Sequence, residues 1–223
     1  MNAPYYAFFD VDGTICKVKT MFSFLRFYYL TGSSFGLLRF KWVTFKIRCL
    51  LRLGKKRAFI NRYYYRLFRG ERRHALLECG EKWFQQCLEN KQDVWCQSVI
   101  EQVLWHQKNG AEVVMVSGSM RPCLLPIAKK WGVEHIIATD LADDDGVLSG
   151  EIDGVVTIGA GKAEKIQHFL TEKNFNELHF CYAYGDHESD IPMMSLVGHP
   201  VAIKGDPLLE AHARAQAWRI MEQ

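Results

Sequence analysis

The sequence has no proline between Pro4 and Pro122, although the chain of 223 residues contains six prolines. Because proline removes a backbone donor and ends or kinks helices, its absence there leaves room for long helices. The seven cysteines include no CxxC pair and lack the spacing of a disulfide framework, so we expect free thiols in a reducing compartment. The N-terminus has no basic stretch followed by an apolar run, as a secretory signal requires. We therefore expect a cytoplasmic location.

Acidic residues are scarce in one part of the chain. Residues 15–74 contain sixteen Lys or Arg and a single acid, Glu71, whereas the whole chain has a net charge of only +3. Residues 22–68 also contain fourteen aromatic residues, and the longest uncharged run among them, residues 27–38, has 12 residues. A membrane-spanning helix needs roughly 20 apolar residues, so this segment does not span a bilayer. Its composition suits either a solvated helical domain or contact with an anionic membrane surface.

The pattern of apolar residues predicts two kinds of structure. Residues 5–9 and 112–119 predict buried strands, and the region from about 20 to 106 predicts helices. After residue 119, helices and strands alternate, which is typical of a doubly wound parallel α/β sheet. The expected elements are a helix from Pro122 to Gly132, a strand at 135–141, a hairpin at 146–159, a helix at 161–173, a strand at 178–186, a short helix at 189–197, a strand at 199–205 and a terminal helix at 207–219.

Polar residues follow three of the predicted strands. Asp10 and Asp12 come after the first strand, Ser117 after the second, and Asp186 after the strand at 178–186. Ligands of parallel α/β sheets gather beyond the carboxyl ends of the strands, so we expect these side chains to meet. Two carboxylates held two residues apart repel each other unless a positive charge lies between them. Oxygen ligands suit a divalent cation such as Mg²⁺.

Four short motifs occur in a fixed order: "DVDGT" at 10–14, "VSGS" at 116–119, "GAGKAEK" at 159–165 and "YGDHESD" at 184–190. Together they resemble the motifs of the haloacid dehalogenase superfamily of phosphoryl-transfer enzymes, over residues 5–14 and about 109–205. The position of the helical segment and "LSGEIDG" resemble the phosphoserine-phosphatase-like branch, subfamily IB. The resemblance implies an α/β core at 1–14 and 108–223 with an inserted α-helical cap at 15–107.

The resemblance also implies the chemistry. Asp10 would be the nucleophile that carries an aspartyl-phosphate, and Asp12 the general acid and base. Ser117, the backbone N–H of Gly118 and the ammonium of Lys162 would bind the transferred phosphoryl group. An aspartate two residues after the nucleophile is similar to the pattern of phosphatases and phosphomutases.

The same resemblance implies a magnesium site. Asp10, the backbone carbonyl of Asp12 and Asp186 would hold Mg²⁺, while Asp190 would orient Lys162 or metal-bound water from behind them. Thr14 resembles the family position that supports Asp10 by a hydrogen bond.

The substrate is less sharply indicated. Phosphoserine phosphatases usually have a glutamate nine residues after the nucleophile, where it meets the substrate's amino group, but this chain has Lys19. A lysine repels an ammonium, so we expect a small, more anionic soluble phosphomonoester. The alternatives are a lipid phosphatase at a membrane surface, of the kind that acts on phosphatidylglycerophosphate, or a phosphomutase. A nucleic-acid-binding protein that uses the basic segment is less favoured because it leaves the catalytic set unused. The sequence does not indicate the oligomeric state.

Overall fold

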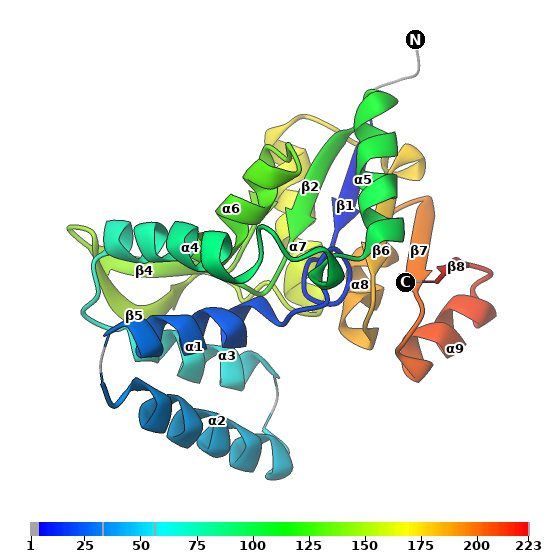
Figure 1. Ribbon diagram of the computed structural model, residues 1–223. Coiled ribbons are helices and arrows are strands. Elements are labelled where there is room, and N and C mark those ends of the chain that lie inside the picture. The colour runs from blue at the N-terminus through cyan, green and yellow to red at the C-terminus, as the bar shows by residue number, and fades with distance from the viewer. Residues whose placement is uncertain (1–4, 33, 56, 223) are drawn as a thin grey trace.

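A parallel sheet of six strands forms the centre of the computed structural model, which describes residues 5–32, 34–55 and 57–222 (Figure 1). Every neighbouring pair of strands runs parallel, in the order β3-β2-β1-β6-β7-β8. The order places β1 between β2 and β6, which carry the other polar strand ends. The strands are β1 (Tyr6–Phe9), β2 (Glu112–Val116), β3 (His135–Ile137), β6 (Tyr182–Gly185), β7 (His199–Ile203) and β8 (Arg219–Met221).

Helices cover both faces of the sheet. On β1, Phe9 packs into one hydrophobic cluster with α5 and α6, while Phe8 packs into a second cluster with α7, α8 and α9. This alternation follows from the two-residue period of a strand. The predicted doubly wound α/β fold is thereby confirmed. The helices are α5 (Gln97–Lys108), α6 (Arg121–Lys130), α7 (Ala160–Glu172), α8 (Ile191–Met194) and α9 (Pro207–Ala215).

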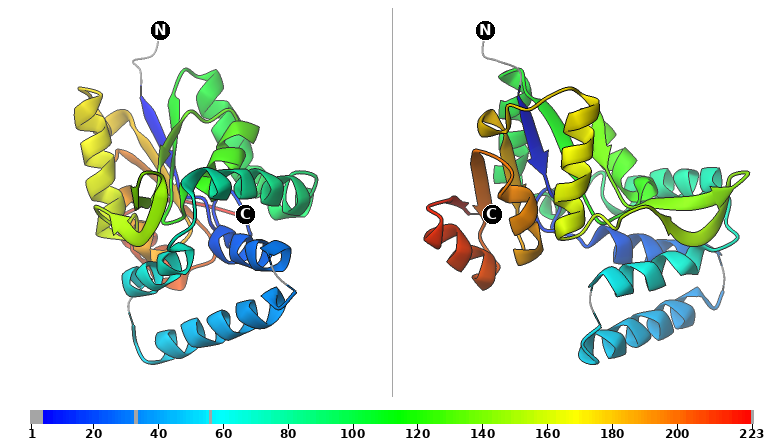
Figure 2. Two further views of the ribbon diagram at one scale, coloured as in Figure 1. Left: turned by 90° about the vertical axis from the view of Figure 1, so that its left-hand side faces the viewer. Right: turned by 180° about the vertical axis from the view of Figure 1, so that it is seen from behind.

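The insertion between β1 and β2 forms helices that lie beyond the carboxyl ends of the strands (Figures 1 and 2). Within it, α2 is the outermost helix in all three views, and α1 and α3 lie between α2 and the rest of the molecule. The helices are α1 (Thr20–Gly32), α2 (Gly36–Arg52), α3 (Arg57–Tyr65) and α4 (Arg73–Cys87). Short 3-10 turns occur at Arg66–Phe68, Gln92–Val94, Leu178–Phe180 and Glu188–Asp190.

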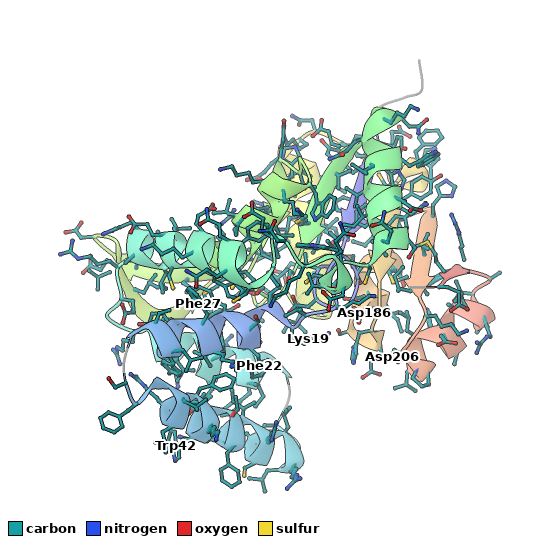
Figure 3. The ribbon with its side chains drawn as sticks, in the orientation of Figure 1. Lys19, Phe22, Phe27, Trp42, Asp186 and Asp206 are labelled. Carbon is teal, nitrogen blue, oxygen red and sulfur yellow. The ribbon has the colours of Figure 1, made fainter. Side chains whose placement is uncertain are left out.

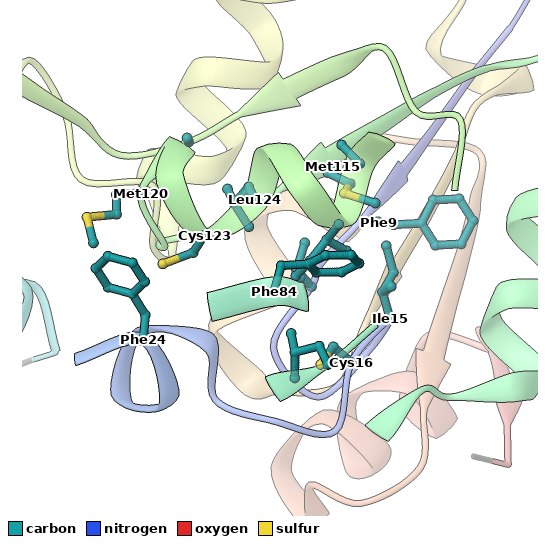
Figure 4. Close-up of a cluster of buried hydrophobic side chains, with 14 of the residues drawn as sticks. Phe9, Ile15, Cys16, Phe24, Phe84, Met115, Met120, Cys123 and Leu124 are labelled. Carbon is teal, nitrogen blue, oxygen red and sulfur yellow. The ribbon is translucent and has the colours of Figure 1, made fainter. Parts of the chain in front are cut away.

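One hydrophobic cluster runs from the sheet into this insertion. Phe9 of β1, Phe24 of α1, Phe84 of α4 and Leu124 of α6 all belong to it and are buried (Figure 4). Helix α4 crosses α6 so closely that a Cβ on Gly80 would lie 2.0 Å from the backbone oxygen of Pro122. The boundaries expected from the sequence, a cap at 15–107 between core segments 1–14 and 108–223, stay a prediction, and residues 1–4 lie outside the described residues.

The position of the small hairpin differs from the prediction. We expected it at 146–159, after a strand at 135–141, but the antiparallel pair is β4 (Asp140–Asp144) with β5 (Val147–Asp153). The two strands are joined by Asp145 and Gly146, whose φ angles are +47° and +75°. Positive φ at both central residues is what a tight hairpin turn requires, and Asp-Gly is a favoured pair for it.

The end of the chain also differs from the prediction of one helix over 207–219. Helix α9 ends at Ala215, and Arg219–Met221 form β8 at the edge of the sheet. Ala217, between the two, has a φ of +54°, which an α-helix does not allow. A three-residue strand is too short to show a two-residue period in the sequence.

All seven cysteines are free. In the described part of the chain, none of the helices combines the length and the apolar character needed to cross a bilayer.

A buried histidine makes the stability of this fold sensitive to acid. The ring of His106, in α5, is fully buried and lies 3.0 Å from the hydroxyl of Tyr5 and 2.9 Å from that of Tyr184. Burial lowers the pKa of His106 from 6.5 to about 4. Between these values the unfolded chain binds a proton that the folded chain does not, so stability falls as the pH falls.

We expect His106→Gln to remove part of this acid sensitivity. The glutamine keeps hydrogen-bonding capacity but takes up no proton, so the wild type should lose about 2 kcal/mol more than the variant between pH 7 and pH 5. Urea unfolding at both pH values measures the difference. The exposed His168, in α7, offers a matched control, and His168→Gln should follow the wild type. An equal loss of unfolding free energy between pH 7 and pH 5 in His106→Gln and in the wild type would contradict the prediction.

Candidate active site

The polar residues at the strand ends line one cavity of about 270 Å³ between the sheet and the insertion. Asp10 follows β1, Ser117 follows β2 and Asp186 follows β6, while Lys162 lies in the first turn of α7. Figure 3 shows Asp186 and Lys19 close together between the carboxyl ends of the strands and α1. The sheet order therefore brings together residues that are up to 176 positions apart.

Lys162 joins two buried carboxylates. Its Nζ donates to Asp10 Oδ1 and, at 2.7 Å, to Asp190 Oδ1, and all three residues are at most 6% exposed. Burial alone would raise the pKa of Asp10, but the charge and hydrogen bond of Lys162 outweigh it and hold that pKa below its usual value. Burial would lower the pKa of Lys162, but the two carboxylates raise it. The carboxyl of Asp10 is therefore ionised and lies beside the ammonium of Lys162.

Asp12 is held by the first residue of α1. Its Oδ1 accepts hydrogen bonds from Thr20 Oγ1 at 2.6 Å and from Thr20 N at 3.2 Å. The hydroxyl of Thr20 also lies 2.8 Å from that of Ser119. Burial raises the pKa of Asp12 to about 6, and the charge of Asp10 acts in the same direction. A carboxyl with a pKa in this range can give up and take back a proton near neutral pH.

Asp186 is approached by three groups. Thr14 Oγ1 donates to its Oδ1 at 3.2 Å, and the ammonium of Lys19 lies 4.0 Å from its Oδ2. The hydrogen bond of Thr14 thus goes to Asp186, and the expected support of Asp10 by Thr14 stays a prediction. Gly13 has a φ of +116°, and a Cβ there would lie 2.1 Å from Asp186 Oδ2, so only glycine fits. Burial and the charge of Asp10 raise the pKa of Asp186 to about 7.

The donor set suits a hard divalent cation. Carboxylate oxygens of Asp10, Asp186 and Asp190 all lie within 4.8 Å of one another. Lys19 Nζ also donates to the backbone carbonyl of Asp12, so a cation from the chain itself already lies among the groups predicted to bind metal. Oxygen atoms and concentrated negative charge are what Mg²⁺ requires.

The loop after β2 is held by hydrogen bonds, some of which come from the insertion. Ser117 Oγ accepts from Ser119 N at 3.1 Å, which leaves its hydroxyl proton to be donated to a ligand. The carbonyl of Gly118 accepts from Asn61 Nδ2 at 3.1 Å and from the hydroxyl of Tyr65, both on α3. These bonds tie the expected phosphate-binding loop to the insertion.

The wall opposite the carboxylates is largely apolar. It is formed by α1, α2 and α3, and only Asn61 among its lining residues carries a polar side chain. His187, on the sheet side, also lines the cavity, and its Nδ1 accepts from Ser189 N at 3.0 Å. The apolar lining residues of this wall are Met21, Phe22, Ile47, Leu51 and Ile60.

Four residues of this arrangement were not predicted from the sequence: Thr20, Ser119, Asn61 and Tyr65. Thr20 begins a helix shortly after "DVDGT", and Ser119 is the last residue of "VSGS", so local signals existed for both. Asn61 and Tyr65 are four residues apart and share one helix face, but nothing in the sequence indicates what that face contacts.

Comparisons with known proteins agree with this arrangement. The haloacid dehalogenase-like hydrolase family model matches residues 7–195. The chain is 28% identical to the Inhibition of morphological differentiation protein of Streptomyces azureus, over 97% of this chain and 77% of that protein. It is also 28% identical to phosphoserine phosphatase SerB1 of Mycobacterium tuberculosis, over 97% of this chain and 70% of that protein.

Solved structures show the same fold. A protein of unknown function from Bordetella pertussis Tohama I matches with a TM-score of 0.85 at 22% identity, over 98% of this chain and 99% of that chain. A substrate-bound phosphoserine phosphatase matches with a TM-score of 0.69 at 21% identity, over 100% of this chain and 95% of that chain.

The fold, the polar cavity and the family match define a phosphoric monoester hydrolase. The chain belongs to the haloacid dehalogenase-like hydrolase family, and phosphoserine phosphatases are among the proteins it is similar to. The superfamily predicted from the four motifs is confirmed, and the similarity to phosphoserine phosphatases agrees with the predicted branch.

The contacts of Thr20 lead to a prediction about turnover. Thr20→Val removes the 2.6 Å hydrogen bond to Asp12 but keeps the shape and the backbone donor. We expect kcat for phosphomonoester hydrolysis to fall about tenfold with little change in KM, because Asp12, the predicted general acid and base, loses its orientation. Thr31→Val, which removes a hydroxyl bonded only within α1, is the matched control and should leave kcat unchanged. An unchanged kcat in Thr20→Val would show that Thr20 does not position Asp12.

Proposed function

We propose that the protein is a magnesium-dependent phosphatase that forms an aspartyl-phosphate on Asp10. The observation that supports this most is the buried ion pair between the ammonium of Lys162 and the carboxylate of Asp10, in which Lys162 also contacts Asp190. Asp12, two residues after Asp10, has a pKa of about 6. One carboxyl is kept as an anion and its neighbour can carry a proton. Nucleophilic phosphoryl transfer needs these two states side by side.

In the first half of the reaction, a carboxylate oxygen of Asp10 attacks phosphorus. The bond from phosphorus to the ester oxygen breaks, and Asp12 gives its proton to that oxygen, so the alcohol leaves neutral. Lys162, Ser117 and the backbone N–H of Gly118 hold the transferred group and offset its charge.

In the second half, a water molecule attacks the phosphorus of the aspartyl-phosphate. Asp12, now a carboxylate, takes the water proton, and the bond from phosphorus to Asp10 breaks. Inorganic phosphate leaves, and both aspartates return to their starting states. Thr20 keeps Asp12 in place through both steps.

Asp10, the backbone carbonyl of Asp12 and Asp186 are the groups that would hold Mg²⁺, which would supply positive charge to the phosphoryl oxygens. Asp190 lies behind Lys162 and orients it. Thr14 positions Asp186.

Lys19 supports a small anionic phosphomonoester as the substrate. Its side chain is 59% exposed and lines the cavity. The ammonium of Lys19 would repel an amino group on a substrate bound there and would attract a negatively charged group. The apolar wall from α1, α2 and α3 favours a second candidate, a phosphomonoester on a lipid, because such a leaving group carries apolar surface.

The central test measures phosphate release from a panel of phosphomonoesters. We expect release with Mg²⁺, none in excess chelator, and a loss of at least about a thousandfold in Asp10→Asn, because an amide cannot form the intermediate. Asp153→Asn changes an exposed aspartate at the end of β5 and is the matched control, with unchanged activity expected. Thermal unfolding checks that each variant is folded. An active, folded Asp10→Asn or full activity in chelator would overturn the proposal.

The role of Lys19 is tested with two esters that differ in one group. Phosphoserine carries an ammonium where 3-phosphoglycerate carries a hydroxyl. We expect kcat/KM to favour 3-phosphoglycerate about tenfold or more, and Lys19→Met to bring the ratio close to one. Lys17→Met, an exposed lysine two residues away, should keep the wild-type ratio. A preference of the wild type for phosphoserine would contradict this assignment.

A further inference from the structure

Helix α2 has two apolar faces on opposite sides. Val43 and Ile47 are buried against the rest of the molecule. Leu38, Trp42 and Phe45, at spacings of four and three residues, lie on the other side and are 69%, 59% and 65% exposed. These spacings place the three side chains on one stripe of the helix. Figure 3 shows Trp42 pointing away from the molecule.

Cations border this stripe on both sides. At 3.6 residues per turn, Arg39 and Lys46 fall along one edge of the stripe, and Lys41, Arg48 and Arg52 along the other. Helix α2 contains no acidic residue. Within the described ranges, none of these five side chains forms an ion pair with a carboxylate. The face is therefore apolar along its centre and positively charged at both edges.

This charge pattern distinguishes among the surfaces that could cover the stripe. Two copies of α2 laid face to face would bring ten cations together without a counter-charge. A nucleic acid duplex would meet the cations with its phosphates but would leave the apolar centre of the stripe against a charged backbone. An anionic bilayer offers acyl chains to the centre and negative headgroups to both edges.

We propose that α2 binds peripherally to membranes that contain anionic phospholipid. Leu38, Trp42 and Phe45 enter the boundary between headgroups and acyl chains, and the flanking cations contact the headgroups. Because α2 is the outermost helix of the insertion, its stripe can meet a flat surface without rearrangement (Figures 1 and 2). The helix lies on the membrane and does not cross it.

The opposite side of α2 links this surface to the proposed function. Ile47 and Leu51, on α2, line the cavity that contains Asp10. A bilayer bound to the stripe would therefore lie one helix diameter from the apolar wall of that cavity. Binding itself requires no catalysis, so it can be tested separately from the proposed phosphatase activity.

The experiment is co-sedimentation of the full chain with two kinds of vesicle, pure phosphatidylcholine and phosphatidylcholine with one third phosphatidylglycerol. We expect binding to the anionic vesicles, and we expect binding to the neutral vesicles to be weaker by at least about tenfold. The triple variant Leu38→Ser/Trp42→Ser/Phe45→Ser should lose anionic binding by about tenfold or more. Lys41→Glu/Arg48→Glu, which leaves the apolar stripe intact, should lose the preference for anionic lipid.

Two controls make the result specific. Leu208→Ser removes an equally exposed apolar side chain on α9 and should bind like the wild type. Asp10→Asn should also bind like the wild type, so a failure of the catalytic proposal does not affect this test. Absence of binding to anionic vesicles would overturn the proposal, as would binding that the triple variant retains. Self-association or RNA retention that the triple variant abolishes, without vesicle binding, would likewise overturn it in favour of another occupant.

Discussion

Four carboxylates share one small space, and the site depends on how their repulsion is balanced. Asp10, Asp12, Asp186 and Asp190 all line the same cavity, and Lys162 is buried between two of them. Burying charges is unfavourable unless each is paired and hydrogen-bonded. Lys162 accordingly stabilises the folded site, because its ammonium neutralises part of the charge of Asp10 and Asp190. The divergent pKa values of Asp10 and Asp12 follow from this one arrangement.

The insertion contributes to the site directly and does more than cover it. Thr20, the first residue of α1, bonds Asp12, while Asn61 and Tyr65 of α3 bond the carbonyl of Gly118. Each contact connects a helix of the insertion to a loop after a strand of the sheet. A movement of α1 or α3 would therefore change the orientation of the Asp12 carboxyl and of the loop at Gly118.

Much of the fold and site could be predicted because both depend on local signals. Asp10, Ser117 and Asp186 each end a recognisable apolar strand, and strand ends in a parallel sheet converge. The contact of Thr14 with Asp186 could not be predicted, because it depends on the side-chain rotamer and on two segments meeting. The contacts of Asn61 and Tyr65 with Gly118 could not be predicted either, because they depend on how α3 packs against the loop after β2. The sequence pattern of a helix does not indicate its packing partner. The hairpin was placed wrongly although Asp145-Gly146 carried a clear turn signal.

The close crossing of α4 and α6 has a consequence for recombining domains within this family. At Gly80 the two backbones approach so closely that no side chain fits, and the cluster around Phe84 and Leu124 continues from one helix to the other. A cap exchanged between relatives at the strand ends alone would bring a foreign α4 onto a resident α6. A chimaera that retains stability must therefore carry both helices from the same parent, even though α6 lies outside the inserted segment in the sequence.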